Sequence, residues 1–334
     1  MRNAIPFGRA GRTGSGPLLA PPLAALSLAA LLATTACAGD ASEPGTIRVA
    51  HVCGGINVAT IATNAATFPE GVEVEKICFD GGAEAVQALV GGGVDAFVGS
   101  TEHVASTRSR GLDVRAYAAL SQAVPYSLVS RAGSGVESVA DLAGETVAVT
   151  SPGSLSDTEL LKAASDAGVD YSGMNVIGAG SGASMAAAIR EGGAVAGMVS
   201  EPQLSDMLAS GDYTLTWEPD FDYAALVVLS RADWVEGHEE ELTRFLEGLR
   251  EAEDRSREDG AFAVESLADE DFAVSDEVLA DAVRATLGNT PRGLAIEEPV
   301  YRDTIDLLTE VDRLDAEDAP TFDEAFDFSL LPGS

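Results

Sequence analysis

Lysine is almost absent from this 334-residue chain, which contains only Lys76 and Lys162. Lysine and arginine together number 20, whereas aspartate and glutamate number 54, so the formal net charge is −34 at pH 7. A surface with so many carboxylates and so few cations repels nucleic acids and anionic membranes. The composition therefore excludes nucleic acid as a partner, and we interpret the acidic charge as a property that favours solubility.

Histidine and cysteine are also scarce, with three of each. The three histidines are scattered and lack ligand-like spacing, so no metal site is expected. The sequence has no P-loop, no G-x-S-x-G nucleophile elbow and no zinc-enzyme motif. The glycine-rich run at 178–183 imitates a dinucleotide fingerprint, but a short helix follows it and an internal repeat explains it. We therefore expect no cofactor and no enzymatic activity.

Residues 1–36 have the composition of a secretory signal, with three arginines, no acidic residue and a short apolar run at 23–32. Small residues directly before Cys37 resemble the cleavage box of a bacterial lipoprotein, although Thr34 stands where leucine is commoner. We predict a signal peptide at 1–36 and an acylated Cys37 with a flexible tether over 37–46. Lipid would then anchor the protein to the outer face of the cell membrane. Ordinary signal cleavage with an incidental Cys37 is the alternative.

The sequence from Gly81 to Gly111 occurs a second time about one hundred residues later. Gly82 aligns with Gly182, and a shift of one residue then aligns Val98 with Val199. Each copy has a glycine-rich turn, an amphipathic helix, a Gly-Gly stop, a buried strand and a polar helix start. Two copies so far apart indicate two similar α/β lobes rather than a solenoid, whose repeats are roughly 20–50 residues long.

The ends of the two repeated strands are the expected ligand site. The alignment gives Ser100 and Glu201 matching positions at the carboxyl ends of matching strands, where open α/β sheets bind their ligands. We predict an α/β chain with two doubly wound lobes and a ligand cleft between them. Lobe 1 would begin over 47–121, lobe 2 would occupy 122–223, and a return strand with C-terminal helices over 224–334 would complete lobe 1.

Two cysteines remain after Cys37. Cys53 follows the first predicted strand, at 47–51, and Cys78 lies late in the second, at 72–79. The first two strands of a doubly wound sheet are usually neighbours, and an exported protein lies in an oxidising compartment. We predict a Cys53–Cys78 disulfide, with two free thiols in a core as the alternative.

Capping residues predict two of the helix starts. Ser100 can cap the helix that carries Glu102 and His103, because its hydroxyl can accept a hydrogen bond from a free N–H group. Ser156 and Glu159 have the spacing of a capping box, which predicts a helix that begins after Ser156.

Several short motifs resemble those of a known family. They are FPEGVEV at 68–74, Gly81-Gly82, GVDA at 93–96, SVADLAG at 138–144, SPGS at 151–154 and Glu201-Pro202. In order and spacing they resemble the ABC-importer solute-binding proteins for sulfonates, taurine, nitrate and thiamine precursors, over nearly the whole mature chain. The resemblance implies the two-lobed type II periplasmic-binding-protein fold, a small-molecule ligand between the lobes, and an ABC permease with its ATPase as partner. We expect a monomer.

Candidate ligand contacts lie at the helix starts, strand ends and lobe crossings. Glycines allow close approach of the backbone, helix amino ends offer N–H groups, carboxylates pair with amino nitrogens, and tyrosines stack on flat ligands. The candidates are Gly54, Gly55, Ser100, Thr101, His103, Tyr126, Ser151, Gly153, Ser154, Glu201 and Tyr223. Each also has a structural alternative: glycines that only form turns, hydroxyls that only cap, a charge that only complements a helix dipole, or tyrosines in the core.

The residues near the predicted cleft favour one ligand class. Arginine is scarce there, whereas Glu102 and Glu201 are close, which favours a neutral or cationic heteroaromatic such as a thiamine-type pyrimidine, or another amine. A sulfonate, taurine or nitrate bound by helix amino ends is the alternative within this class. Outside it stand a ligand sensor and an enzyme on the same fold. Related pyridoxal-phosphate enzymes need a lysine, and Lys76 and Lys162 fit that role poorly.

Overall fold

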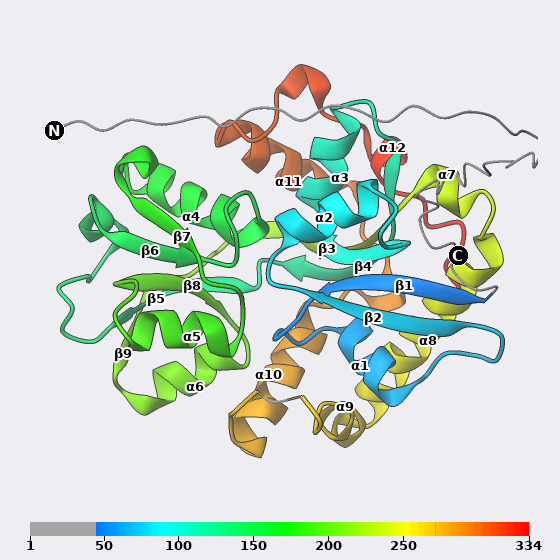
Figure 1. Ribbon diagram of the computed structural model, residues 1–334, viewed down its shortest axis with the longest axis horizontal. Coiled ribbons are helices and arrows are strands. Elements are labelled where there is room, and N and C mark those ends of the chain that lie inside the picture. Colours follow the sequence, from blue (N-terminus) through cyan, green and yellow to red (C-terminus); the bar gives the residue numbers. More distant parts are fainter. Residues whose placement is uncertain (1–44, 271, 334) are drawn as a thin grey trace, which may run out of the picture. The chain divides into compact units, whose positions relative to one another are not determined.

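The computed structural model describes residues 45–270 and 272–333. Three predicted features lie outside the described residues: the signal peptide, the acylation of Cys37 and the tether up to residue 44. Within the described part of the chain, no helix has both the length and the apolar character needed to cross a bilayer. Two five-stranded sheets, each covered by helices, form the body of the described chain (Figure 1).

The first sheet has the strand order β2-β1-β3-β10-β4. β1, β2 and β3 are parallel, and β10 is antiparallel to both β3 and β4. The strands are β1 (Thr46–Val52), β2 (Glu73–Phe79), β3 (Ala96–Ser100), β4 (Val114–Ala123) and β10 (Asp222–Arg231). Because β10 follows the whole second sheet in sequence, the chain leaves the first sheet after β4 and returns to pair between β3 and β4.

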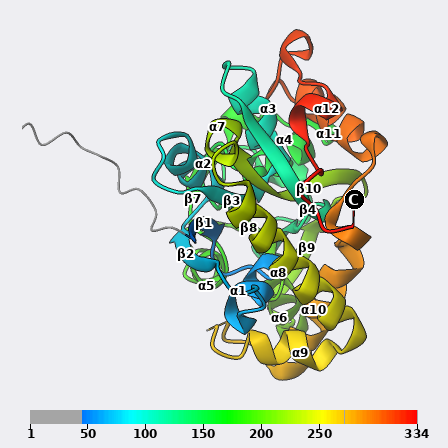
Figure 2. The same cartoon turned by 90° about the vertical axis from the view of Figure 1, so that its right-hand side faces the viewer.

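Helices cover both faces of the first sheet, and we call this sheet with its helices lobe 1. One face carries α2 (Gly82–Val90), α3 (Thr101–Arg108), α11 (Glu298–Glu310) and α12 (Phe322–Ala325). The other carries α1 (Val58–Ala65), α7 (Ala232–Val235), α8 (Glu239–Glu258), α9 (Gly260–Ser266) and α10 (Asp276–Asn289). α8 lies beside α1, α9 and α10 (Figure 2).

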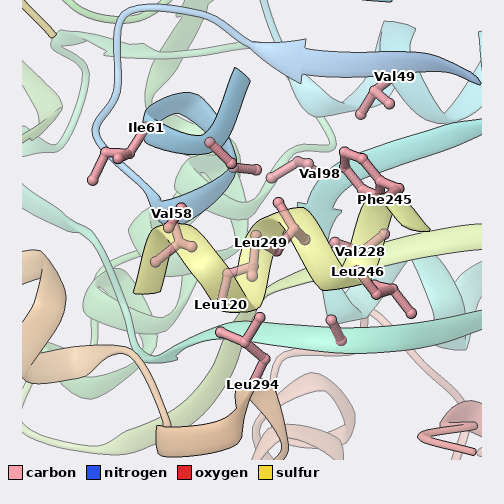
Figure 3. Packing of buried hydrophobic residues seen from close by; sticks show 14 of the residues in the cluster. Val49, Val58, Ile61, Val98, Leu120, Val228, Phe245, Leu246, Leu249 and Leu294 are labelled. Carbon is pink, nitrogen blue, oxygen red and sulfur yellow. The ribbon is translucent and has the colours of Figure 1, made fainter. Parts of the chain in front are cut away.

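A large apolar core lies between the first sheet and α8. Phe245 and Leu249 of α8 meet Val58 of α1 and Val228 of β10, and all four side chains are fully buried (Figure 3). Phe245 also stacks on Phe68, with ring centroids 5.5 Å apart. Each Å² of apolar surface removed from water contributes about 25 cal/mol to the free energy of folding, so this cluster is the main stabilising element of the lobe. A stable core holds the ends of the strands in fixed positions.

The second sheet has the strand order β7-β6-β8-β5-β9 and forms lobe 2 with its helices. Its strands are β5 (Tyr126–Arg131), β6 (Thr146–Val149), β7 (Asn175–Gly178), β8 (Ala196–Ser200) and β9 (Tyr213–Trp217). α4 (Leu155–Asp166) covers one face, and α5 (Ala183–Arg190) and α6 (Gln203–Ser210) cover the other. The α/β fold class with two doubly wound lobes is therefore as predicted.

The two copies of the repeat are related by a constant offset of 100 residues, so the predicted one-residue shift is wrong. The N–H of Gly93 donates to the Ala88 carbonyl and that of Gly193 to the Ala188 carbonyl, so the Gly-Gly turns are equivalent. Ser100 therefore corresponds to Ser200, not to Glu201. The alignment of Val98 with Val199 was misleading because β3 is buried on both faces. A continuous apolar run does not show which residues of the two copies are equivalent.

One predicted helix cap is confirmed and the other is wrong. The Ser100 hydroxyl accepts a hydrogen bond from the Glu102 N–H at 3.3 Å, as predicted. α4, however, begins at Leu155, so Ser156 lies inside its first turn, where its hydroxyl accepts a bond from the Thr150 N–H at 2.9 Å. The hydroxyl is held by the preceding strand end, and the capping box predicted for Ser156 and Glu159 does not form.

The predicted disulfide is confirmed. Cys53 and Cys78 are bonded, with their Cα atoms 5.4 Å apart. The bond forms because β1 and β2 are parallel neighbours, which places the residue after β1 beside the penultimate residue of β2. It joins the β1–α1 loop to the edge of the sheet.

Candidate functional site

A cavity of about 340 Å³ lies where the strand ends of the two lobes face each other. Its lining includes the ends of β1 and β3 from lobe 1, and Thr150 and Ser200 at the ends of β6 and β8 from lobe 2. The two segments that cross between the lobes, at 123–126 and 218–219, also line it. This is the edge at which open α/β sheets bind ligands.

Six of the predicted site residues line this cavity: Gly55, Ser100, His103, Tyr126, Ser154 and Glu201. The other five, Gly54, Thr101, Ser151, Gly153 and Tyr223, are outside the lining. Thr101 and Tyr223 are buried behind it, and the Gly153 N–H donates to Asp157 at 2.7 Å. Gly54 and Ser151 meet residues of the opposite lobe instead.

Several polar residues of the lining were not predicted. They are Asn57, Ser121, Ser127, Thr150, Ser200, Glu218, Thr286 and Asn289. Asn57 could have been predicted from the sequence, because asparagine before a helix is a common N-cap. In the structure its Oδ1 accepts a hydrogen bond from the Thr60 N–H at 3.0 Å. Thr286 and Asn289 lie on α10, far along the chain, and no local pattern connects that helix with the strand ends.

Residues of the two lobes contact each other near the cavity. The Ser181 hydroxyl donates to the Cys53 carbonyl, and Gln203 Nε2 donates to the Phe272 carbonyl at 3.1 Å. On another side, Arg313 forms an ion pair with Asp157 at 2.7 Å. Together these contacts join lobe 1 to lobe 2 around the cavity.

The charged groups of the lining are carboxylates. Glu201 and Glu218 are present, and no lysine or arginine is found among the described residues that line the cavity. Glu201 accepts hydrogen bonds from the Ser205 N–H at 3.2 Å and the Ser205 hydroxyl at 2.8 Å, which fixes its orientation. A ligand with an ammonium or protonated ring nitrogen would meet an opposite charge here.

His103 contributes a neutral imidazole to the lining. Burial lowers the pKa of His103 to about 4, so the ring carries no charge at pH 7. A neutral imidazole offers one donor and one acceptor nitrogen. With Tyr126 on the lobe-2 side, the cavity combines an aromatic ring, a neutral imidazole and carboxylates, which suits a small heteroaromatic or amine.

The starts of α1, α3 and α4 also meet the cavity, through Asn57, Ser100 and Ser154. Helix amino ends carry partial positive charge and free N–H groups. They are the groups in this lining that could hold an anion such as a sulfonate.

Comparison with known proteins gives a family and a fold. Residues 69–259 match the family described as NMT1/THI5 like. No curated protein sequence matches the chain. Among solved structures, a protein of Bordetella bronchiseptica RB50 is 23% identical, with a TM-score of 0.78 and coverage of 86% of this chain and 96% of that one.

Two further structures are binding proteins by their descriptions. The alkanesulfonate-binding protein of Xanthomonas axonopodis pv. citri, bound to MOPS, is 19% identical, with a TM-score of 0.68 and coverage of 86% and 99% of the two chains. The periplasmic nitrate-binding protein of Synechocystis PCC 6803 is 15% identical, with a TM-score of 0.66 and coverage of 87% and 92%. Because the family match spans more than half of the 334 residues, the chain belongs to the NMT1/THI5-like family, and it has the two-lobed fold of the periplasmic binding proteins.

Proposed function

We propose that this chain is the extracytoplasmic solute-binding component of an ABC importer. It would capture a small organic molecule between its lobes and deliver that molecule to the permease and its ATPase. The observation that carries the proposal is the cavity at the facing strand ends, which both lobes and both crossings line. Lobe 1 would comprise 47–121 and 224–334, lobe 2 would comprise 122–223, and a lipid at Cys37 would anchor the monomer to the membrane.

Closure of the lobes around the ligand is the proposed mechanism. The two crossings are short and lie against the cavity, so a small rotation there would open it. A ligand that contacts both lobes stabilises the closed form over the open one, which is how binding shifts the equilibrium. Such a cycle requires no chemical change in the bound molecule. Turnover of a bound compound would instead favour an enzyme on the same fold.

The ligand is proposed to be a neutral or cationic heteroaromatic, such as a thiamine-precursor-like pyrimidine, or another amine. Glu201, Glu218, Tyr126 and the neutral His103 support this choice. The alternative is a sulfonate, taurine or nitrate held by the starts of α1, α3 and α4. The named ligands of the two structural relatives favour that alternative, and the absence of a cation from the described lining argues against it.

A thermal-shift screen of the chain from Ala38 tests the proposed function. The panel contains pyrimidines, amines, sulfonates, taurine and nitrate. A ligand at one hundred times its dissociation constant is expected to add about 2.7 kcal/mol to the free energy of unfolding. A hit among pyrimidines or amines supports the carboxylate site, and a hit among the anions supports the helix starts. If no compound raises the melting temperature, this ligand assignment is wrong for the whole panel.

Glu201→Gln is expected to weaken binding of a cationic hit by roughly ten- to a hundredfold, because a charge-assisted hydrogen bond contributes about 1.5–3 kcal/mol. Glutamine keeps the size of the side chain and removes its charge. Isothermal titration of both proteins with the same compound measures the change. Glu251→Gln, on the exposed side of α8, serves as the control and should bind as the wild type does. Equal affinities for the wild type and Glu201→Gln would exclude Glu201 as a charge partner.

A further inference from the structure

Two buried glutamates from opposite lobes, Glu102 and Glu159, lie near enough beside the ligand cavity for the charge of Glu102 to act on Glu159. Glu102 is in the first turn of α3 in lobe 1, and Glu159 is in the second turn of α4 in lobe 2. Their side chains belong to residues that are only 7% and 2% exposed. Both glutamates lie outside the cavity lining, although their neighbours Ser100, His103 and Ser154 are part of it. Ligand contact therefore does not account for this pair.

The pair has few groups that could stabilise two negative charges. No oxygen of either carboxylate makes a hydrogen bond of full geometry with any described residue. The Thr158 hydroxyl for Glu102 and the Tyr126 N–H for Glu159 are close enough to lower the respective pKa values, but only partly offset burial. An unpaired buried carboxylate is strongly disfavoured unless it takes up a proton.

The charged and titratable groups around the pair do not supply a free cation. They are Asp157 on α4, Arg313 after α11, Tyr126 on β5 and Tyr223 on β10. Arg313 is already paired with Asp157 at 2.7 Å, and Lys162 on α4 is paired with Asp166 and Glu310. Tyr171 donates its hydroxyl to Asp157. Three carboxylates therefore share one arginine, and the pair is left with an excess of negative charge.

Burial favours the protonated form of both glutamates, and the charge of Glu102 adds to the effect on Glu159. Burial raises the pKa of Glu102 to about 7. Burial, followed by the charge of Glu102, raises the pKa of Glu159 well above its usual value. Burial, together with the two glutamates, also raises the pKa values of Tyr126 and Tyr223, which keeps both phenols neutral. These effects depend on the burial of both side chains, because separation of the lobes would admit water to both carboxyl groups.

We propose that closure of the lobes is coupled to protonation of the Glu102–Glu159 pair, so that the closed form takes up protons and ionisation of the pair drives it open. The inference rests on the hinge closure of the proposed function. It adds a means of release, because a solute held at acidic pH would be given up as the pair ionises.

The direction of the effect follows from the difference in proton binding. Both pKa values are higher in the closed form than in an open, hydrated one, where glutamate titrates near 4.5. Closure is therefore fully favoured below about pH 4.5, and this contribution is lost as the pH rises through about 7. For Glu102 alone, the ratio of closed to open protein is expected to fall about twentyfold between pH 5.5 and pH 7.5.

Small-angle X-ray scattering of the ligand-free chain from Ala38 tests the coupling, since the described residues 45–270 and 272–333 belong to one compact unit. The radius of gyration is measured at pH 5.5 and pH 8.0 in 1 M NaCl, where a Debye length of about 3 Å screens the exposed charges but not a buried pair. We expect the protein to be compact at pH 5.5 and expanded at pH 8.0. An unchanged radius in the wild type would overturn the proposal. Since no solute is added, the result is independent of the ligand screen.

Glu102→Gln and Glu159→Gln assign the effect to the pair. Glutamine has the shape of a protonated glutamate and cannot ionise, so each variant should remain more compact at pH 8.0 than the wild type. The double variant should remain closed at both pH values. Glu298→Gln, on the exposed side of α11, is the control and should expand as the wild type does. If the single variants fold, as far-ultraviolet circular dichroism would show, and expand like the wild type, the pair is not the switch.

Discussion

Gly81→Ala is expected to weaken solute binding by at least about tenfold, which corresponds to 1.4 kcal/mol. Gly81 lies in the turn between β2 and α2 of lobe 1, directly opposite Ser151 in the turn between β6 and α4 of lobe 2. A Cβ atom on Gly81 would lie 2.2 Å from the Ser151 hydroxyl oxygen and 2.7 Å from its Cβ. Real carbon contacts are not that short, so the lobes would have to separate.

The backbone of Gly81 makes the interpretation of this variant clear. Its φ of −159° and ψ of 164° are extended values that alanine adopts without strain. Ser151 is 5% exposed, so it has little room to turn away while the lobes are in contact. The cost of the substitution therefore arises from the contact between lobes. In the open form the added methyl group would have no such neighbour, and the variant should fold normally.

A compensating substitution separates this effect from a general defect. Ser151→Gly removes the two atoms that would lie within 3.0 Å of the new methyl group, so Gly81→Ala combined with Ser151→Gly should regain most of the lost affinity. Gly173→Ala is the matched control, because a Cβ there would have no neighbour within 4 Å. Isothermal titration with the strongest compound of the thermal screen gives the affinities. Wild-type affinity in Gly81→Ala, or no recovery in the double variant, would show that the lobes do not close through this contact.

The fold could be predicted from the sequence because the repeat carries its own pattern of helix, Gly-Gly turn and buried strand. The same pattern could not give the register to one residue. The strands β3 and β8 are buried along their length, so valines at neighbouring positions match equally well. Hydrogen bonds from the two Gly-Gly turns resolve the register and place Ser100 opposite Ser200 in the repeat. Glu201 still reaches the cavity, but from the position equivalent to Thr101.

Residues that depend on long-range packing could not be predicted at the candidate site. Tyr223 was predicted from its place near a crossing, but it lies in a buried cluster with Val124 and Leu307 rather than in the cavity wall. α10 contributes Thr286 and Asn289 to the lining only because its apolar face packs on α8, α9 and β4 of the same lobe. Local sequence patterns report which face of a helix is buried and do not report what its exposed residues will meet.

Replacement of Cys53 and Cys78 by serine is expected to lower the free energy of unfolding by about 3.5 kcal/mol. The bond closes a loop with a sequence separation of 25 residues, and loop-closure entropy gives this magnitude for a cross-link of that length. With about 2 cal/mol/K of unfolding entropy per residue, the melting temperature of the chain from Ala38 should fall by roughly 6 °C.

The disulfide should also affect the site, because the Cys53 carbonyl accepts a hydrogen bond from the Ser181 hydroxyl of lobe 2. Without the bond to Cys78, the loop from β1 to α1 loses its covalent link to β2, and Gly55 and Asn57 of the cavity lining lie within this loop. We therefore expect weaker solute binding together with the lower melting temperature. Dithiothreitol provides the internal control: it should lower the melting temperature of the wild type to that of the double-serine variant and leave the variant unchanged. Equal melting temperatures for oxidised and reduced wild type would mean that the loop is held by its packing alone.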